Sequence, residues 1–572
     1  MHRCDSVPGL SPLDSRLATD SVPSRSAAAA VLVLAVSLYI SSRTVADPDL
    51  WGHVRFGQDI LACGHATAPD PYSYVTVNQP WINHEWLSEV IFAVVFNAFG
   101  APGLLALKSS IMLAIGGLLY GHLLKHGGNI ISAGAIILLV AYIMLVGDRT
   151  VRPQLFTYLL FLLLALILHA AQTRHLGSLW LVPPLLALWA NLHGGFLAGL
   201  GLLLVWAAAR IAALVFAALR TGQKTSGGLS QFGHQASLGR DENGTGYPLG
   251  ACGSVTVVPW PMLQIALCLV LSLLATLLNP YGPRLIAFLL QTATVPRPDI
   301  VEWSPVDVTK TEGLAYLALV ILSVYALATT RRPRSFALIA AFTCTVILPL
   351  EAFRHLPLFA IASAVFVGEH LCDAWQRWLG GEPGASHQPI GPRTVSASRS
   401  ALFASLLPLT GALMFCGAAA HNSLRIHIDP HNCVYPARAV QLLKTSGVRG
   451  NLAVFFDWGE YAIWHLAPAV KVSYDGRRET VYSDELCKLN ADWNLGLHDW
   501  DAILERYPTD LALIDRPSAG YNLMRLKAGW TMVYEDSLCA LFARSQSRSL
   551  IDQLRRTPIS DLPANGAGLC FP

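Results

Sequence analysis

Apolar runs of membrane-spanning length constrain this chain more than any other feature. About eleven such runs recur before residue 420, and most approach the roughly 17–25 residues that an α-helix needs to cross a bilayer. The chain is 53% hydrophobic and 13% charged, whereas a soluble domain carries about 25% charged residues. The pattern therefore predicts an α-helical polytopic membrane protein. The runs lie near 27–40, 101–121, 130–147, 153–171, 178–192, 194–219, 261–279, 314–330, 335–350, 355–372 and 401–420.

The first run, 27–40, has two interpretations. It is either a retained first helix, which we favour, or the core of a signal peptide cleaved near 44–46. Both interpretations place the polar loop that follows outside the cytoplasm. Residues 87–100 are apolar but short, and they contain Glu89 and Asn97. We interpret this segment as an interfacial or half-inserted helix rather than a span.

About eleven spans, counted from a cytoplasmic N-terminus, give a consistent topology. The basic segment Arg-Arg-Pro-Arg at 331–334 falls inside, as the positive-inside rule expects. The connections rich in His, Arg and Asn all fall on the opposite face. They are the opening loop, 147–154, 191–195, 279–284 and 351–357.

A change in composition near residue 421 marks a second domain. Charged residues become frequent there, and candidate strands at 451–456 and 510–515 alternate with candidate helices. This order predicts a small α/β domain with a mostly parallel sheet, placed outside the cytoplasm like the polar loops. The predicted organisation is a disordered cytoplasmic N-terminus (1–25), a transmembrane domain (26–420) with a first extracytoplasmic loop (46–100), a soluble domain (421–545) and a flexible tail (546–572).

Charge and cysteine content exclude several classes of function. The formal net charge is +3 and the basic runs are short, so we expect no nucleic-acid partner. The 11 cysteines include no Cys-x-x-Cys pair, which argues against zinc and iron–sulfur centres. The oligomeric state stays open.

Two carboxylates in the opening loop, Asp47 and Asp49, are the catalytic candidates. Pro48 between them disfavours helix at Asp47, so we expect an extended chain with the two side chains on opposite sides. A carboxylate partly removed from water has a raised proton affinity, which suits a general base. It could instead hold a divalent cation. The structural alternative is that Asp47 caps the following helix.

His84 and Glu85 follow in the same loop. They resemble the start of the zinc-protease motif HExxH, but the second histidine is missing, so the protease interpretation fails. The pair could bind a hydroxyl or a metal, or form a local hydrogen bond. Trp51, Trp81 and Trp86 are interpreted as interfacial anchors, with stacking on sugar rings as the alternative.

Cationic side chains in other connections are candidates for binding phosphate. Arg149 and Arg152 lie at a helix junction, and Arg354 lies in another loop of the same predicted face. A guanidinium matches phosphate geometry, although arginines near the membrane surface also snorkel to headgroups. His193 precedes a Gly-Gly pair, and such small residues let backbone or ligand approach closely.

Several longer segments occur in order between about residues 47 and 487. They are DPDLWGH, RFGQDIL, PWINHEWLSEV, RPQLFTYLLF, ALWANLHGGFLAGL, LLNPYGPRLI, FRHLPLFA, FFDWGEYAIWHL and SYDGRRETVYSDE. Their combination resembles a group of bacterial polytopic membrane proteins related to the GT-C glycosyltransferase superfamily. The resemblance covers most of the chain.

The resemblance implies an enzyme of the bacterial inner membrane that transfers a sugar from a polyprenyl-phosphate-linked donor to an acceptor on the extracytoplasmic face. Its expected partners are this lipid-linked donor and membrane lipids, and a divalent cation is left open as a cofactor. The acidic motif of the superfamily falls on Asp47 and Asp49. The expected substrate-binding residues are His53, His84, Glu85, Arg149, Arg152, His193 and Arg354.

The resemblance also has departures. The acidic motif is usually followed by two tryptophans, and here Gly52 takes the second place. The segments at 457–459 and 474–477 have no role that the family supplies. Two other functions stay open, a transporter or flippase for a lipid-linked or polar solute, and a non-catalytic scaffold that binds a partner through 421–545.

Overall fold

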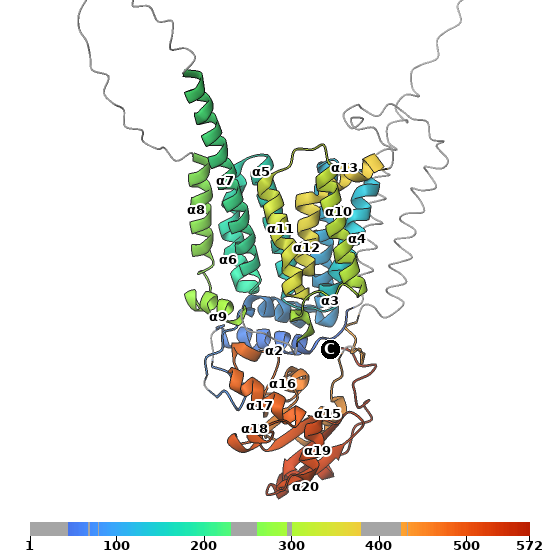
Figure 1. Cartoon of the computed structure of the whole chain (residues 1–572). Helices are drawn as coiled ribbons and strands as arrows, with labels where there is room; N and C mark the ends of the chain where they lie inside the picture. Colours follow the sequence, from blue (N-terminus) through green and yellow to red (C-terminus); the bar gives the residue numbers. More distant parts are fainter. Residues whose placement is uncertain are drawn as a thin grey trace, which may run out of the picture.

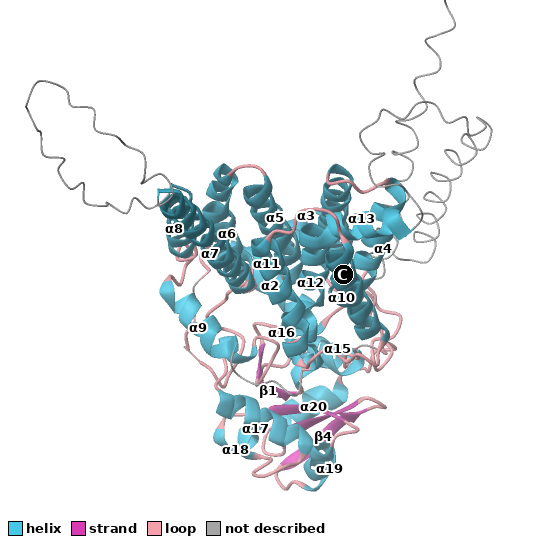
Figure 2. Cartoon of the chain, turned by 45° about the horizontal axis from the view of Figure 1, so that its top comes forward, coloured by secondary structure: helices cyan, strands magenta, loops and turns pink. Residues whose placement is uncertain are grey.

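The computed structural model describes residues 44–66, 69–77, 79–229, 260–293, 300–378, 425–431 and 433–572. Helices form a bundle at one end, and a smaller domain with a β-sheet forms the other end (Figure 1; Figure 2). Helix α2 (Pro48–Cys63) lies across the end of the bundle, between the bundle and the smaller domain (Figure 1).

Five helical segments in the described part of the chain are long and apolar enough to cross a membrane, and four further apolar helices are shorter. All nine coincide with predicted spans. The predicted runs at 27–40 and 401–420 lie outside the described residues, so the total of eleven stays a prediction. The long segments are α3 (Trp86–Lys125), α5 (Gln154–Thr173), α7 (Phe196–Leu229), α10 (Thr311–Thr329) and a run formed by η3 (Phe353–His355), α12 (Leu356–Ala362), the π-helical η4 (Ser363–Val367) and α13 (Gly368–Trp378). The shorter ones are α4 (Ile130–Asp148), η1 (Leu176–Leu181) with α6 (Val182–Leu192), α8 (Trp260–Ala275) and α11 (Phe336–Glu351).

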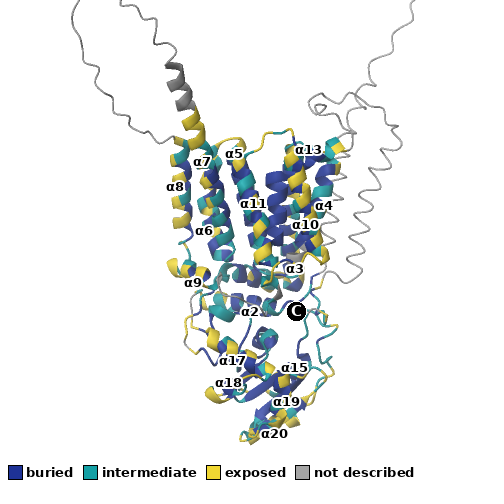
Figure 3. Cartoon of the chain, in the orientation of Figure 1, coloured by how far each residue is buried: buried dark blue, intermediate teal, exposed yellow. Residues whose placement is uncertain are grey.

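Residues on the outward faces of the bundle helices are exposed (Figure 3), and many of them are large and apolar. On α8, for example, Leu267, Val270, Leu271 and Leu274 are each at least 40% exposed. An apolar face of this extent marks a surface that another apolar phase covers. Together with the length of the helices, this composition shows a multi-pass membrane protein.

Helix α3 is interrupted near its middle. Gly100 has non-helical backbone angles (φ 64°, ψ −159°), and Pro102 follows inside the helix. Proline removes a backbone donor and clashes with the preceding turn, which explains a break at this place. The structure thus separates the segment up to Phe99 from the span that follows, at the boundary predicted between 87–100 and 101–121.

The first part of α3 packs closely against α2, and Gly57 permits the approach. A β-carbon at Gly57 would overlap the backbone oxygen of Glu89 and would lie 2.9 Å from the β-carbon of Ala93. Both separations are too short for non-bonded atoms, so only glycine allows the two helices to come this close.

Replacing Gly57 with alanine should destabilise the protein by about 2 kcal/mol. Overpacking costs about 1–3 kcal/mol, and the better helix propensity of alanine offsets up to about 1 kcal/mol of it. Thermal unfolding of the detergent-solubilised protein would show the loss. The matched control is Gly117→Ala in α3, where a β-carbon meets nothing within 4 Å. An equal melting temperature for the two variants would contradict this account of the contact.

The C-terminal domain is built on a five-stranded sheet in the order β2-β1-β3-β5-β4. Strand β1 pairs in parallel with β2 and β3, whereas β5 is antiparallel to both β3 and β4. The predicted α/β sheet is therefore confirmed, but it is mixed rather than mostly parallel, because the last two strands form an antiparallel hairpin beside β3. The strands are β1 (Gly450–Val454), β2 (Val470–Val472), β3 (Leu511–Asp515), β4 (Trp530–Glu535) and β5 (Cys539–Arg544), and the helices are α15 (Ala437–Ser446), α16 (Gly459–Leu466), α17 (Asp484–Leu495), α18 (Ala502–Arg506), α19 (Ala519–Leu526) and α20 (Arg548–Arg556).

The opening loop adds to the edge of this sheet. Ser73 forms a parallel bridge with Val472 of β2. The backbone N–H of Val472 donates to the carbonyl of Tyr72 at 2.9 Å, and that of Tyr74 donates to the carbonyl of Val472 at 3.2 Å. Two segments about 400 positions apart are thereby joined by main-chain hydrogen bonds, as in strand addition to a sheet edge.

Two expectations about this region are wrong. The segment 546–572 is not a flexible tail, because it forms α20 and then buries Phe571 to 2% exposure. Trp51 is not an interfacial anchor, because it is also 2% exposed and its ring centre lies 4.7 Å from that of Phe571. The physical reason is the same in both cases, since apolar rings from distant segments bury one another. The other rings around Trp51 belong to Tyr435, Tyr461, Trp464 and His465.

Candidate active site

A cavity of about 740 Å³ lies between the end of the bundle, α2 and the C-terminal domain. Its lining residues come from helix ends and loops that are far apart in sequence, and they include most of the residues predicted from sequence. The predicted site residues that line it are Asp47, Asp49, His53, His84, Glu85, Arg152, His193 and Arg354.

Arg149 is the predicted site residue that the structure does not bring to the cavity. It forms the C-cap of α4, is exposed, and is not among the residues that line the cavity. Its backbone carbonyl accepts a hydrogen bond of 2.9 Å from the N–H of Val45. Arg149 is thus close to Arg152 in sequence, but it does not lie at the cavity.

Arg152 is engaged by three carboxylates. Its Nη2 lies 2.5 Å from Asp47 Oδ2 and 3.1 Å from Asp49 Oδ2. Its Nη1 donates to Glu302 Oε1 at 2.9 Å. A guanidinium so committed is better placed to hold these carboxylates than to bind a phosphate.

The two aspartates meet at this guanidinium, so the expectation that they point to opposite sides is wrong. The reason is that α2 begins at Pro48, and Asp47 is its N-cap. The Asp47 Oδ1 atom accepts the backbone N–H of Asp49 at 2.9 Å. The Asp47 side chain is only 6% exposed, against 30% for Asp49. Asp47 thus has the capping role that the sequence left open, and Asp49 is the more accessible of the pair.

The pKa of Asp49 is raised to about 7. Burial is the main cause, Arg152 opposes it, and the negative charge of Asp47 adds to it. A carboxyl with a pKa near neutrality accepts a proton more readily than an exposed carboxylate while still being ionised in part at physiological pH. Asp49 is therefore suited to act as a general base.

Gly52 allows a carboxylate of the C-terminal domain to reach α2. The backbone N–H of Gly52 donates to Glu460 Oε2 at 3.1 Å, and a β-carbon there would overlap that oxygen. A tryptophan at this place, as in the related motif, would clash with Glu460. Burial, and then the charge of Asp49, raise the pKa of Glu460 well above its usual range.

A second cluster of ionisable groups surrounds Glu85. Its Oε1 lies 3.8 Å from His84 Nε2 and 3.4 Å from His193 Nε2, and its Oε2 lies 4.0 Å from His53 Nδ1. Burial would raise the pKa of Glu85, but the charges of His84 and His53 outweigh burial and lower it. Glu85 is therefore ionised at neutral pH.

His53 and His193 carry different charges in this cluster. Burial disfavours the charged form of His53, but its hydrogen bond to Glu89 (3.3 Å) and the charge of Glu85 prevail and raise its pKa to about 9. Burial lowers the pKa of His193 to about 3. The His193 Nδ1 accepts the backbone N–H of Gly195 at 2.9 Å, so the proton of this neutral ring is on Nε2, facing Glu85.

Arg354 differs from Arg152 in having no close carboxylate. Across the described ranges it makes no hydrogen bond or ion pair within 4 Å, and its guanidinium carbon lies 4.8 Å from the centre of the Trp303 ring. It lines the cavity and its charge acts on Glu85 and His193. It is thus a cation available to an anionic ligand.

The residues of the cavity can also accommodate a divalent cation. His53, Glu85 and Glu89 each offer a ligand atom within 4.8 Å of the others. Two carboxylates and an imidazole suit Mn²⁺ or Mg²⁺. Asp47 and Asp49, the ligands considered from sequence, are less suitable because Arg152 already holds both.

Several residues of the cavity were missed by the sequence analysis. Most of them are in the segments 457–460 and 474–479, which include the segments for which the family resemblance supplied no role, and two others are Glu89 and Glu302. The sequence feature that could have identified them is the density of charged residues in those two segments. The missed residues with ionisable side chains are Glu89, Glu302, Asp457, Glu460, Arg477, Arg478 and Glu479.

Comparison with known proteins gives similarity in structure only. No family model and no curated protein matches the sequence. The oligosaccharyltransferase of Archaeoglobus fulgidus in its apo form superposes with a TM-score of 0.52 at 13% identity, covering 90% of this chain and 74% of that one. ArnT of Cupriavidus metallidurans bound to undecaprenyl phosphate has a TM-score of 0.45 at 13% identity, covering 91% and 98%. AglB of A. fulgidus with an inhibitory peptide and a dolichol phosphate has a TM-score of 0.47 at 13% identity, covering 90% and 74%.

Only the first of these three similarities is strong enough to argue from, and at 13% identity it shows the fold alone. The fold is the one that the sequence motifs implied. The chain therefore shares its fold with this oligosaccharyltransferase.

Proposed function

We propose that this chain is a glycosyltransferase of the bacterial inner membrane, which transfers a sugar from a polyprenyl-phosphate-linked donor to an acceptor on the extracytoplasmic face. The observation that carries the proposal is the presence of Asp49 and Arg354 in one cavity at the end of a bundle with the GT-C fold. One is a carboxyl with a pKa near 7, and the other is a cation without a close carboxylate in the described part of the chain.

In the proposed reaction, Asp49 takes the proton of the acceptor hydroxyl. The hydroxyl oxygen forms a bond to the anomeric carbon of the sugar, and the bond from that carbon to the lipid phosphate breaks. Attack from the face opposite the phosphate inverts the configuration. Negative charge grows on the departing phosphate, so a fixed cation at that place lowers the barrier. Arg354 has this role, and His84 with Glu85 lies on the acceptor side.

The cluster of His53, Glu85 and Glu89 would hold a divalent cation if the reaction uses one. A bound cation would supply positive charge to an oxygen of the substrate. The protein's own contribution there is the pair of carboxylates and an imidazole that must release its proton before it can bind a metal. With a pKa of about 9, His53 keeps that proton at neutral pH and itself provides a positive charge between the two glutamates.

The location of the cavity favours transfer over transport. It lies between helix ends and the C-terminal domain, whereas transporter sites lie near the bilayer midplane between broken helices. A non-catalytic scaffold would not need an aspartate in the cavity with a pKa close to 7. Both features support a reaction at the membrane surface.

The pH dependence of kcat/KM should follow the ionisation of the Asp49 carboxyl group. Because the ionised form is the base, kcat/KM should fall about tenfold per pH unit below a pKa of about 7 and level off above it. Release of polyprenyl phosphate from lipid-linked sugars would be followed between pH 5 and 8.5 in membranes. Activity that is flat down to pH 5 would contradict the assignment of Asp49 as the base.

Two arginines predicted together from sequence should now behave differently. Arg354→Ala should lower transfer about 10–150-fold, the loss expected for a charge-assisted contact of roughly 1.5–3 kcal/mol. Arg149→Ala is the matched control, and it should keep full activity because Arg149 does not line the cavity. The assay compares release of polyprenyl phosphate from a panel of lipid-linked sugars at equal protein levels. If both variants lose the same fraction of transfer activity, or if neither loses any, the proposed phosphate site is contradicted.

A further inference from the structure

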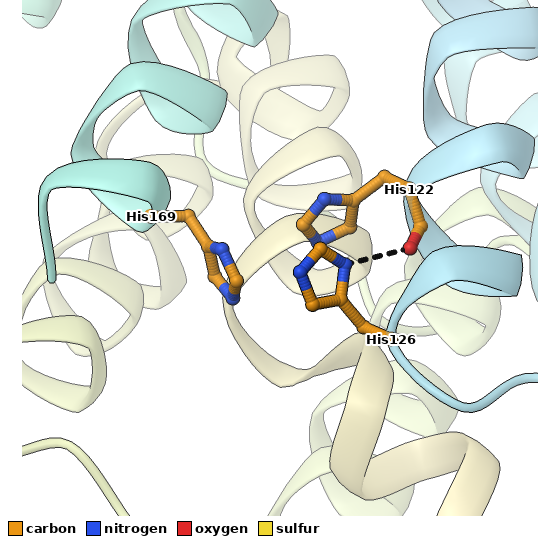
Figure 4. A group of neighbouring side chains, drawn as sticks. All are labelled: His122, His126 and His169. Atoms are coloured by element: carbon orange, nitrogen blue, oxygen red, sulfur yellow. Dashed lines mark hydrogen bonds between the residues drawn. The ribbon is translucent and has the colours of Figure 1, made fainter. Parts of the chain in front are cut away.

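Three histidines form a cluster away from the cavity. His122 lies in the last turns of α3, His126 directly follows α3, and His169 lies near the end of α5 (Figure 4). One ring nitrogen from each residue lies within 4.8 Å of those of the other two. The ring centres are 4.4–4.7 Å apart.

The cluster is at the end of the bundle opposite the cavity. Helix α5 begins at Gln154, which lines the cavity, and His169 is fifteen residues further on, or about 22 Å along the helix. The basic segment 331–334 is close by, since Arg332 Nη1 donates to the carbonyl of His126 at 2.8 Å. The topology prediction places that segment, and hence the cluster, on the cytoplasmic side.

The hydrogen bonds prepare two of the rings to bind a metal. His126 Nδ1 donates to the carbonyl of His122 at 2.8 Å, and His122 Nε2 donates to the carbonyl of Val365 at 3.1 Å. Each ring therefore has its second nitrogen without a proton. Metal-ligating histidines commonly donate their other N–H to a backbone carbonyl in this manner. Val365 belongs to the π-helical η4, a type of segment frequently found at functional sites.

His169 supplies a third ring that nothing else engages. It is 3% exposed, and its ring nitrogens have no hydrogen-bond partner in the part of the chain that the structure describes. A metal ion would give this ring a partner. His126 is only partly buried, which leaves a route for an ion to enter.

We propose that His122, His126 and His169 bind a first-row transition-metal ion that ties the end of α3 to the end of α5. Imidazole is a preferred ligand of Zn²⁺, Ni²⁺ and Cu²⁺, and no carboxylate belongs to the cluster to favour Mg²⁺ or Ca²⁺. A tetrahedral ion with bonds of about 2.0–2.1 Å holds its ligands roughly 3.3 Å apart. The three nitrogens lie within 4.8 Å of one another, so the rings must come closer to bind one ion. Cysteine spacing does not bear on this site, because its ligands are histidines.

The test uses the full-length protein, purified in detergent with an affinity tag that contains no histidine and stripped of metal with a chelator. Zn²⁺ stoichiometry and affinity are measured by competition with a chromogenic chelator, and Co²⁺ is added to record its visible spectrum. Variants His126→Gln and His169→Gln are compared with His175→Gln, which changes an exposed histidine beyond the end of α5. His169 is more buried than His126, so His169→Gln is the variant more at risk of misfolding. If it does not fold, His126→Gln alone provides the test.

We expect His126→Gln and His169→Gln to bind one Zn²⁺ fewer than the wild type, or to bind it more than about 100-fold more weakly, which exceeds the usual effect of changing an outer-shell partner. His175→Gln should bind as the wild type does. Zn²⁺ should also raise the melting temperature of the wild type more than that of His126→Gln. The comparison by stoichiometry separates this site from any ion held by His53, Glu85 and Glu89. Equal stoichiometry and affinity in all three variants would overturn the proposal.

Discussion

Asp49→Asn should lower sugar transfer about 10²–10⁴-fold, the usual contribution of a positioned general base. Asparagine keeps the size of the side chain but cannot accept the acceptor proton. Arg152 keeps its contacts with Asp47 and Glu302, so the surroundings of the site should stay in place. The measurement is release of polyprenyl phosphate at pH 8, where the wild-type aspartate is ionised.

Stability provides the control for this variant. A carboxyl whose pKa is raised in the folded protein, from 3.8 to about 7, makes folding less favourable as the pH rises through that interval. The asparagine side chain has no such titration, so at pH 8 the variant should melt no lower than the wild type. Asp552→Asn, at an exposed position outside the cavity, should leave activity unchanged. Full activity of Asp49→Asn, and of the double variant with Asp47→Asn, would exclude Asp49 as the base.

The sequence was informative where local chemistry determines the structure. Apolar runs longer than a bilayer is thick have few alternatives to helices, and the described helices occur where these runs are. The positive-inside rule then assigned Asp47, His84, His193 and Arg354 to one face, and the structure brings these four to one cavity. Helix ends that share a membrane face need only modest packing to converge, which is why this inference held.

Other features depend on contacts between distant segments, which periodicity does not report. Trp51 was assigned to lipid because tryptophan is common at membrane interfaces, yet the aromatic rings of the C-terminal domain bury it. Glu460 could not be placed because its partner is the backbone of Gly52, 408 positions away. Arg152 was expected to bind phosphate, and only the fold shows that Glu302 and two aspartates surround it.

Arg477→Ala should reduce stability by about 3–5 kcal/mol, the largest loss that we expect from a change of one side chain in this chain. The Arg477 guanidinium bonds Asp475 through Nε (2.8 Å) and Nη2 (2.7 Å), and Nη1 reaches Asp70 at 2.6 Å. Both carboxylates are 0% exposed. Removing the arginine would leave two buried charges with no cation between them, which is why the cost exceeds that of a surface ion pair.

The same guanidinium joins the opening loop to the C-terminal domain, since Asp70 belongs to the former and Asp475 to the latter. It also lies 5.0 Å from the centre of the Trp81 ring, a cation–π distance. We therefore expect Arg477→Ala to lower the melting temperature and to expose the opening loop to limited proteolysis. Arg477→Lys should give an intermediate loss because lysine cannot bind Asp475 with two parallel bonds. Arg506→Ala removes an arginine that is 51% exposed, and its cost should stay below about 1 kcal/mol. If Arg477→Ala and Arg506→Ala have the same melting temperature, then Arg477 does not hold the two parts of the protein together. The rings around Trp51 and the main-chain hydrogen bonds between the opening loop and β2 would then do so.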